Sequence, residues 1–224
     1  MLNLESSGNG SQIIDLSTGK EISKKILALN EIETCFSVIK EYNLHVHAYT
    51  EKGIITTNPL YMDLRNSILF PNKIKFKIVT SVLDYIQKEN PAVLKLIVSS
   101  PQELSSIKTA LENVTNLNIT HIFKKGKYKD KIIDKEYEYL DIAPNNVTKG
   151  NALQVLMDYL KVSKEDILSI GDNLNDIDMF QVSGIGAAIN SASDEVKKFA
   201  SYITLNSAED GGCAEAIYKF IPFQ

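Results

Sequence analysis

The sequence predicts an α/β protein that has a parallel, doubly wound sheet and a second, α+β layer inserted into it. The first observation is that strand-like and helix-like segments alternate from residue 144 onward, and the strands are continuously apolar. The second is that hairpin-like segments interrupt this alternation in the middle of the chain. We therefore expect residues 1–20 and 141–224 to form the core and residues 21–140 to form a separate, inserted α+β domain.

In the C-terminal part, residues 148–160 are predicted to form a helix, because apolar residues recur there at helical spacing. The apolar run 167–171 is predicted to be a buried strand that ends sharply at Gly171. Further helices are expected at 175–182, 193–200 and 212–221, and further strands at 184–190 and 202–206.

In the middle part, residues 21–42 are predicted to form a helix, and the alternating residues 43–50 a strand with a hairpin partner at 53–58. Ser100 is expected to cap a helix that starts at Pro101, after a strand at 93–100. Other expected elements are short helices at 60–70 and 81–88, two or three strands within 118–144, and a Lys-rich exposed turn at 124–131.

Composition limits the protein class. The chain has 224 residues, 44% hydrophobic and 23% charged, which is enough to bury a core without disulfides. Its 24 Lys and Arg against 28 Asp and Glu give a net charge of −4, which argues against nucleic acid as a partner. Cys35 and Cys213 fit neither a disulfide framework nor a metal motif. With no signal peptide and no membrane-length apolar run, we expect a cytoplasmic protein without a membrane partner.

The candidate site follows the strand at 167–171, in the stretch "ILSIGDNLNDIDMF". Ligands of open α/β sheets bind beyond the carboxyl ends of the strands. Asp172 and Asp176 are four residues apart, so one helical turn can bring both carboxylates near one point. Such oxygen ligands suit Mg²⁺, and Asn175 adds an amide that can hold a phosphate oxygen.

Lys149 is the candidate cation, near the start of a helix where the dipole already favours an anion. That place suits a lysine that reaches a phosphoryl group. Two ordinary alternatives stay open: the Asp/Asn cluster as a helix cap, and Lys149 as a solvated surface lysine. His45 and His47 share one face of a strand, and with no third ligand nearby an ordinary surface pair is favoured over a metal site.

Several segments together resemble the haloacid dehalogenase superfamily, and specifically its Cof-type phosphatases. The matching stretches are "NGSQIIDLSTGKEI", "YLDIAPNNVTKGNALQVLMDYL", "ILSIGDNLNDIDMFQVSGIGAAINSASDEVKKFASYIT" and "NSAEDGGCAEAIYKF". Their most specific part is the lysine motif followed by GDxxND. Ile189 and the pair Gly212-Cys213 depart from the family pattern.

The resemblance implies a Rossmann-like core with an inserted cap, and Mg²⁺-dependent hydrolysis of small phosphorylated metabolites, often sugar phosphates. Lys149 would be catalytic, neutralising the phosphate and the nucleophile. Asp172 would bind Mg²⁺ and Asp176 would support the metal shell. Asn175 and Asn190 would bind phosphate, and Asn190 and Asn9 would lie near the mouth of the site.

The resemblance also implies an aspartate nucleophile in an N-terminal DxDGT strand, and the printed sequence contains no DxDGT. Only eight residues precede Asn9, and Asp15 in "IIDLSTGK" is a poor substitute because the acid and threonine expected after it are Ser17 and Gly19. We therefore expect a chain that lacks its first core segment, so that the sheet is partly truncated. Its gene model would be truncated, or its gene split or disrupted. A separate N-terminal fragment is a candidate partner, and these residues alone are expected to be inactive.

The alternative is a non-catalytic module that keeps a phosphate or metal pocket or binds a partner through its cap.

Overall fold

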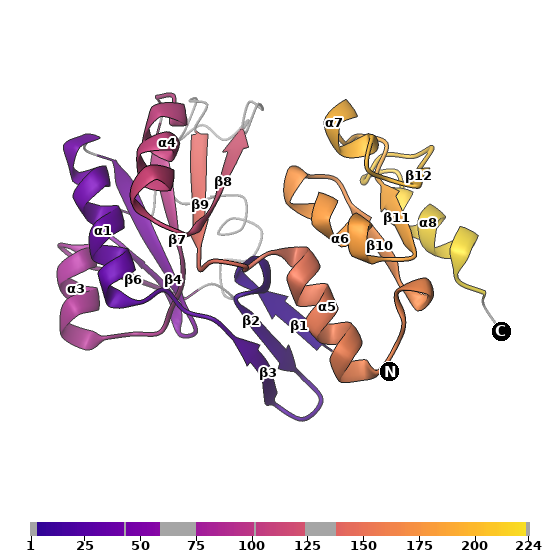
Figure 1. Cartoon of the computed structure of the whole chain (residues 1–224), viewed down its shortest axis with the longest axis horizontal. Coiled ribbons are helices and arrows are strands. Elements are labelled where there is room, and N and C mark those ends of the chain that lie inside the picture. The colour runs from indigo at the N-terminus through magenta and orange to yellow at the C-terminus, as the bar shows by residue number, and fades with distance from the viewer. Residues whose placement is uncertain (1–3, 43, 59–74, 101, 124–137, 223–224) are drawn as a thin grey trace. The chain divides into compact units, whose positions relative to one another are not determined.

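The structure is a computed structural model that describes residues 4–42, 44–58, 75–100, 102–123 and 138–222. The chain divides into two compact units, of which unit 1 comprises Met1–Ser23 and Val147–Gln224, and unit 2 comprises Lys24–Asn146. The helix predicted at 60–70 and the Lys-rich turn predicted at 124–131 lie outside the described residues. Figure 1 shows the elements of each unit.

Unit 1 is built around a parallel sheet. Its strands β10 (Leu168–Gly171), β11 (Ile185–Ala188) and β12 (Tyr202–Ile203) are ordered β10-β11-β12, and both pairs are parallel. The helices are α5 (Lys149–Leu160), α6 (Ile177–Val182), α7 (Asp194–Lys197) and α8 (Gly212–Phe220). The short helical turns η4 (Lys164–Asp166) and η5 (Leu174–Asp176) flank β10. Phe180, Ala188, Ala192 and Val196 form a buried cluster where α6 and α7 pack on β11.

The N-terminal residues form a second sheet in the order β1-β2-β3. Strand β1 (Leu4–Ser7) pairs antiparallel with β2 (Gln12–Asp15) through the turn η1 (Gly8–Gly10), and β3 (Lys20–Lys24) follows. The sequence predicted the turn and β2 but not β1, whose residues are mostly polar. Pairing with β2 satisfies the backbone groups of such a segment, which its own side chains do not signal.

In unit 2 the described residues form a six-stranded sheet with helices. The strands are β4 (His45–Thr50), β5 (Gly53–Thr56), β6 (Phe76–Ile78), β7 (Val93–Ser100), β8 (Asn118–Phe123) and β9 (Glu138–Ala143), in the order β6-β5-β4-β7-β9-β8. All pairs are antiparallel except β5 with β6. Helices α1 (Leu29–Ile39), α3 (Val82–Glu89) and α4 (Ser105–Val114) lie along the sheet, as Figure 1 shows, and the turn η2 (Lys40–Tyr42) follows α1. Their apolar faces and the inner faces of the strands make one large core.

Three expectations for the inserted part of the chain are wrong. The helix predicted at 21–42 does not begin at residue 21, because Lys20–Lys24 form β3 and α1 begins only at Leu29. Ser100 does not cap a helix, because β7 continues through Ser100 and pairs it with Glu138, so α4 begins only at Ser105. The buried Leu104 takes the cap position, and its backbone N–H donates to Glu138 Oε2 at 2.8 Å. His47 is not on the surface: it is 1% exposed and hydrogen-bonded to Thr56 Oγ1 at 2.8 Å.

Candidate functional site

The loop after β10 is organised by the Asp176 carboxylate. Asp176 is 3% exposed, and its Oδ2 accepts the backbone N–H groups of Asp172 and Asn173, each at 3.0 Å. Gly171 makes this fold-back possible, because a Cβ there would lie 2.7 Å from Asp176 Oδ2. The strand therefore turns sharply at Gly171 and wraps its next two amides around a buried carboxylate.

Lys149 reaches the same carboxylate from another element. It is the first residue of α5, and its Nζ donates to Asp176 Oδ1 at 2.6 Å across 27 residues of sequence. The Lys149 side chain is 33% exposed, whereas that of Asp176 is 4% exposed. Lys149 is thus not an isolated surface lysine: it is ion-paired beside a helix N-terminus, with part of its side chain in contact with solvent.

The N-terminus of α5 is held on three sides. Thr148 caps it, since its Oγ1 accepts the N–H of Asn151 at 3.1 Å. The N–H of Gly150 donates to Asp178 Oδ2 at 2.9 Å. On another side, Gly10 lies so close that a Cβ there would stand 2.7 Å from the Thr148 carbonyl oxygen.

Asp172 presents its carboxylate to solvent. Its side chain is exposed, and Oδ1 accepts the Asn173 side-chain amide at 2.8 Å. Asn175 lies nearby on η5, and its Nδ2 donates to Asn9 Oδ1 at 3.4 Å. Asn9 stands in the left-handed region, with φ of 58°, so η1 turns toward η5. The structure therefore brings Lys149, Asp172, Asn175, Asp176 and Asn9 together in unit 1.

Asn190, the remaining predicted site residue, is held by a different loop. Its Nδ2 donates to the Leu205 carbonyl at 3.1 Å, and its backbone N–H donates to Thr204 Oγ1 at 2.9 Å. Within the described part of the chain these bonds fasten Asn190 to the loop after β12 rather than to the Lys149–Asp176 pair. Its predicted phosphate contact stays a prediction.

Asp15, the weak substitute for the nucleophile, closes a turn. Its Oδ1 accepts both the N–H and the hydroxyl of Ser17, at 2.9 and 2.5 Å, and Tyr159 OH donates to Oδ2 at 3.4 Å. The Ser17 hydroxyl is the largest of the effects that lower the pKa of Asp15. Both carboxylate oxygens thus have hydrogen-bond donors, as expected of a turn residue.

The loop after β10 offers a hard cation one exposed carboxylate and one buried amide oxygen. No group of three or more His, Cys, Asp or Glu side chains gathers in a metal-holding arrangement within the ranges that the structure describes. Asp172 offers an exposed carboxylate, and Asn175 Oδ1 is buried without a hydrogen-bond partner. Asp176 has both oxygens engaged by Lys149 and two amides. Mg²⁺ takes only one or two carboxylates alongside water and phosphate oxygens, so Asp172 suffices as the protein's charged ligand.

The sequence alone does not predict the contact between Asp178 and Gly150, although Asp178 stands at the end of the acidic cluster. Its signal is Gly150 itself, a glycine in the first turn of α5 whose φ is not positive. A Cβ at Gly150 would lie 2.6 Å from the Asp178 carbonyl oxygen, so the glycine marks a close backbone approach.

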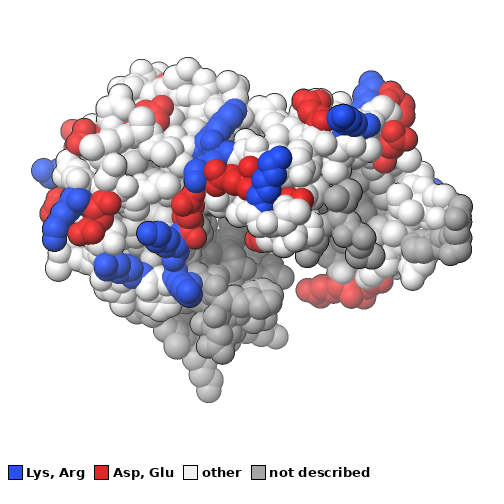
Figure 2. Space-filling model, turned by 90° about the horizontal axis from the view of Figure 1, so that it is seen from below, with Lys and Arg blue, Asp and Glu red and all other residues white. Residues whose placement is uncertain are grey.

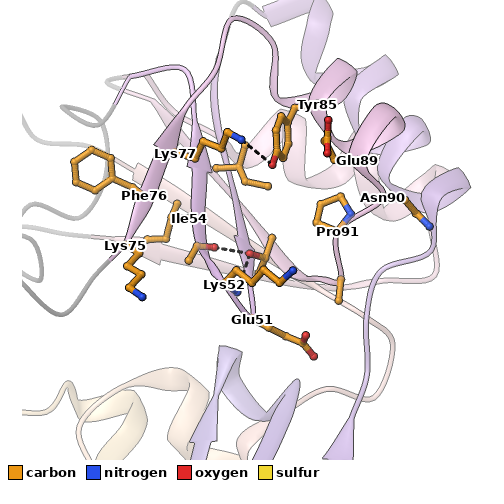
Figure 3. A pocket seen from close by; sticks show the side chains of 14 residues that line it. Glu51, Lys52, Ile54, Lys75, Phe76, Lys77, Tyr85, Glu89, Asn90 and Pro91 are labelled. Atoms are coloured by element: carbon orange, nitrogen blue, oxygen red, sulfur yellow. Dashed lines mark hydrogen bonds between the residues drawn. The ribbon is translucent and has the colours of Figure 1, made fainter.

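A separate pocket of about 480 Å³ lies in unit 2, between the β4–β5 turn, β6 and α3. In Figure 3, Lys77 points to Tyr85, whose hydroxyl lies 3.2 Å from Lys77 Nζ. Lys52 and Lys75 also line the pocket, together with Glu89. The residues predicted from the sequence as a site all belong to unit 1, so this pocket is not part of that site.

Charge on the surface is mixed. Figure 2 shows Lys and Arg side chains interspersed with Asp and Glu on the face that it displays. On that face the basic residues do not gather into a broad patch of one sign. Within the described ranges, none of the helices has the length and apolar character needed to cross a membrane.

Comparisons with known proteins identify relatives of the whole chain. A Streptococcus pyogenes protein that is provisionally named a phosphatase is 28% identical over 216 residues, which cover 95% of this chain and 74% of that protein. A haloacid dehalogenase-like hydrolase from Bacteroides thetaiotaomicron superposes with a TM-score of 0.72 at 25% identity, covering 95% of this chain and 74% of that chain. A sugar phosphatase of haloacid dehalogenase subclass IIB superposes with a TM-score of 0.70 at 18% identity, covering 95% and 73%. This last likeness shows the fold alone.

The family model of haloacid dehalogenase-like hydrolases matches residues 2–217. The match includes the lysine motif, the acidic loop and the parallel sheet described above. The predicted α/β class and the resemblance to Cof-type proteins are both confirmed. The chain belongs to the haloacid dehalogenase-like hydrolase family, in its Cof-type branch.

Proposed function

We propose that this chain carries the phosphate- and metal-binding part of a Mg²⁺-dependent phosphohydrolase for small phosphate esters of the sugar phosphate class. The observation that carries the proposal is the pairing of Lys149 Nζ with Asp176 Oδ1 at 2.6 Å, at the N-terminus of α5 and beside the exposed Asp172. Family membership supports a divalent metal, and the sugar phosphatase among the structural neighbours supports the substrate class.

Each residue has a task in this proposal. Asp172 would hold Mg²⁺, which when bound supplies positive charge to a phosphoryl oxygen. Lys149 would share its ammonium between Asp176 and the phosphate, and the amides of Asn175 and Asn190 would hold phosphate oxygens. Asp176 would support the metal shell indirectly, because its Oδ2 fixes the backbone from which Asp172 projects.

The second part of the proposal concerns activity. The 224 residues contain no DxDGT sequence, so by themselves they would bind a phosphate ester without hydrolysing it. An N-terminal segment that carries DxDGT would provide the aspartate. The DNA immediately upstream is a direct check, since an in-frame or frameshifted DxDGT there would identify that segment.

We also propose a reducing, cytoplasmic location. Cys35 is buried and Cys213 is exposed, and both are free thiols. Burial raises the pKa of the Cys35 thiol to about 12, so it is expected to be unreactive.

The binding test uses calorimetry with inorganic phosphate and with a hexose phosphate, each in the presence of Mg²⁺. Lys149→Ala and Asp172→Ala are expected to weaken binding by roughly 10-fold or more, because charge-assisted hydrogen bonds and a metal ligand are lost. Lys198→Ala and Asp194→Ala are the matched controls, since both side chains are exposed on or next to α7 of the same unit. Phosphate affinity that is unchanged in both Lys149→Ala and Asp172→Ala would disprove the site.

The activity test uses an aryl phosphate with Mg²⁺. We expect no hydrolysis by the purified chain. Hydrolysis that Lys149→Ala or Asp172→Ala abolishes would disprove the second part of the proposal while supporting the first. Phosphate binding that persists without hydrolysis, even when a DxDGT segment is supplied, would instead favour a non-catalytic binding module.

A further inference from the structure

Two carboxylates at the start of α6 form hydrogen bonds to the first turn of α5. Asp176, just before α6, accepts the Lys149 ammonium at 2.6 Å, and Asp178, in the first turn of α6, accepts the Gly150 N–H at 2.9 Å. Lys149 and Gly150 are consecutive residues. One acid therefore fixes the side chain of Lys149, and the other fixes the peptide that follows it.

Asp178 supplies a hydrogen-bond acceptor that α5 itself does not provide for the Gly150 N–H. The first N–H groups of a helix have no partner within the helix. Thr148 Oγ1 accepts the N–H of Asn151, and the first carbonyl acceptor, that of Thr148, takes the N–H of Ala152 at 3.0 Å. The Gly150 N–H receives its acceptor from Asp178, and a carboxylate at a helix N-terminus is also favoured by the helix dipole.

The backbones of the two helices approach too closely for this contact to be loose. A Cβ at Gly150 would lie 2.6 Å from the Asp178 carbonyl oxygen and 3.0 Å from the Asp178 Cβ. From the other side, a Cβ at Gly10 would lie 2.8 Å from the Ala152 Cβ. The first turn of α5 is therefore packed directly between η1 and α6, with little room to shift.

The contact also has a cost. Asp178 Oδ1 is buried and has no hydrogen-bond partner in the described residues. A buried acceptor left without a donor lowers stability, and such groups are uncommon in folded proteins. A cap selected for helix stability alone would not need a carboxylate with one unsatisfied oxygen. This points to a positional role for Asp178.

We propose that Asp178 is a positioning residue for Lys149: by holding the Gly150 amide it fixes the turn from which Lys149 reaches Asp176 and the phosphate. The reach to phosphate rests on the proposed function, whereas the fixing of Lys149 does not. The relevant group is the hydrogen-bond acceptor of Asp178, so asparagine, whose side-chain oxygen accepts the same N–H, should largely replace it.

The first test measures how fast Lys149 is acylated by acetic anhydride, followed by mass spectrometry. In Asp178→Ala the turn is released, and Lys149 is expected to be labelled at least about 3-fold faster. Asp178→Asn is expected to stay within about 2-fold of the wild type. Asp194→Ala, an exposed acid in the first turn of α7, is the matched control and should change nothing.

The second test measures the binding of inorganic phosphate with Mg²⁺ to the same variants. Asp178→Ala is expected to bind about 10-fold more weakly, with Asp178→Asn restoring most of the affinity. If Asp178→Ala does not fold by circular dichroism, Gly150→Ala takes its place, because its added Cβ displaces the turn from α6 and should speed the labelling of Lys149 in the same way.

The two tests separate the two claims. If the wild type fails to bind phosphate, the proposed function falls, and the labelling of Lys149 still decides the role of Asp178. Unchanged labelling in Asp178→Ala, or in Gly150→Ala where it replaces that variant, would overturn the inference. Equal acceleration in Asp178→Asn and Asp178→Ala would also overturn it, since the charge and not the hydrogen bond would then be responsible.

Discussion

At the scale of single residues, Asp176 joins the two parts of the candidate site. One oxygen binds the Lys149 ammonium and the other binds two backbone amides of the loop after β10. Asp172, by contrast, has an exposed side chain, and its Oδ1 accepts the Asn173 side-chain amide. Two acids four residues apart therefore have different tasks, because one is buried among donors and the other faces solvent.

The first prediction concerns Asp176→Asn. The asparagine keeps the shape of the side chain but removes the charge that pairs with Lys149. Its NH₂ group would also stand where Asp176 has an oxygen that accepts hydrogen bonds. We expect the free energy of unfolding to fall by about 1–3 kcal/mol, a modest value because Lys149 is partly solvated. Urea unfolding measures this loss. Asp158→Asn, on the exposed side of α5, is the control, and an equal loss there would refute the specific role of Asp176.

At the scale of secondary-structure elements, helix caps explain where α5 begins. Thr148 has an extended backbone, with φ of −138° and ψ of 162°, and its hydroxyl accepts the N–H of Asn151. This places Lys149 at the first helical position. The cap is local in sequence, so the helix start is predictable before any tertiary contact is known.

The second prediction is that Thr148→Ala lowers the free energy of unfolding by about 1 kcal/mol, the usual cost of a lost N-cap. Thr109→Ala is a matched control, because Thr109 is exposed within α4 and its hydroxyl donates to a carbonyl one turn back. Thermal or urea unfolding of both variants checks the difference. A loss at Thr109 as large as that at Thr148 would contradict the capping role.

Another element-level device is the acid that holds the loop after β12. Glu215 on α8 accepts the Tyr202 hydroxyl at 2.5 Å and the backbone N–H groups of Leu205 and Asn206. The Tyr202 hydrogen bond, followed by the backbone N–H of Leu205, lowers the pKa of Glu215. The Leu205 carbonyl of this loop accepts the Asn190 side-chain amide, so Glu215 helps to position Asn190 indirectly, through the loop.

The third prediction follows from this lowered pKa. A carboxyl whose folded-state pKa is depressed adds stability above its unfolded pKa, and loses it as pH falls through the folded pKa. The stability difference between the wild type and Glu215→Gln should therefore shrink as pH falls from ~6 to ~3. Urea midpoints across this range measure it. Glu209→Gln, an exposed neighbour, should show no such trend, and a constant difference for Glu215→Gln would refute the linkage.

At the scale of the whole molecule, the chain forms two compact units with separate buried cores. Unit 2 packs α1, α3 and α4 on its sheet, whereas the buried cluster of unit 1 lies between α6, α7 and β11. The candidate site residues all belong to unit 1, although they come from both ends of that unit's discontinuous sequence.

The fourth prediction compares one core residue from each unit. Leu140→Ala, at 0% exposure in unit 2, and Phe180→Ala, at 5% in unit 1, should each cost about 2–5 kcal/mol locally. Amide hydrogen exchange should accelerate mainly in the unit that carries the substitution. Exchange that accelerates equally in both units after either substitution would show that they unfold together.

Much of the fold could be predicted from the sequence. Apolar patterns located α5, α3, β7 and the strands of the parallel sheet. A helix with one buried face has regularly spaced apolar residues, and a fully buried strand has a continuous apolar run. The sequence also located the group of Lys149, Asp172, Asn175 and Asp176. It misplaced the start of α4, because Ser100 is equally compatible with a cap and with a strand end. It missed β1, whose polar residues acquire their structure only by pairing with β2.

The sequence by itself determined the family, the α/β class and the cluster of acids and amides at the end of β10. Only the tertiary structure decided which partner each polar atom takes. Asp176 turned out to serve Lys149 and the loop, Asp178 to hold Gly150, and Asn190 to be fastened by the Leu205 loop. The physical reason is that hydrogen bonds require atoms within about 3 Å in a favourable direction, and spacing along the chain does not specify such geometry between residues that are far apart in sequence.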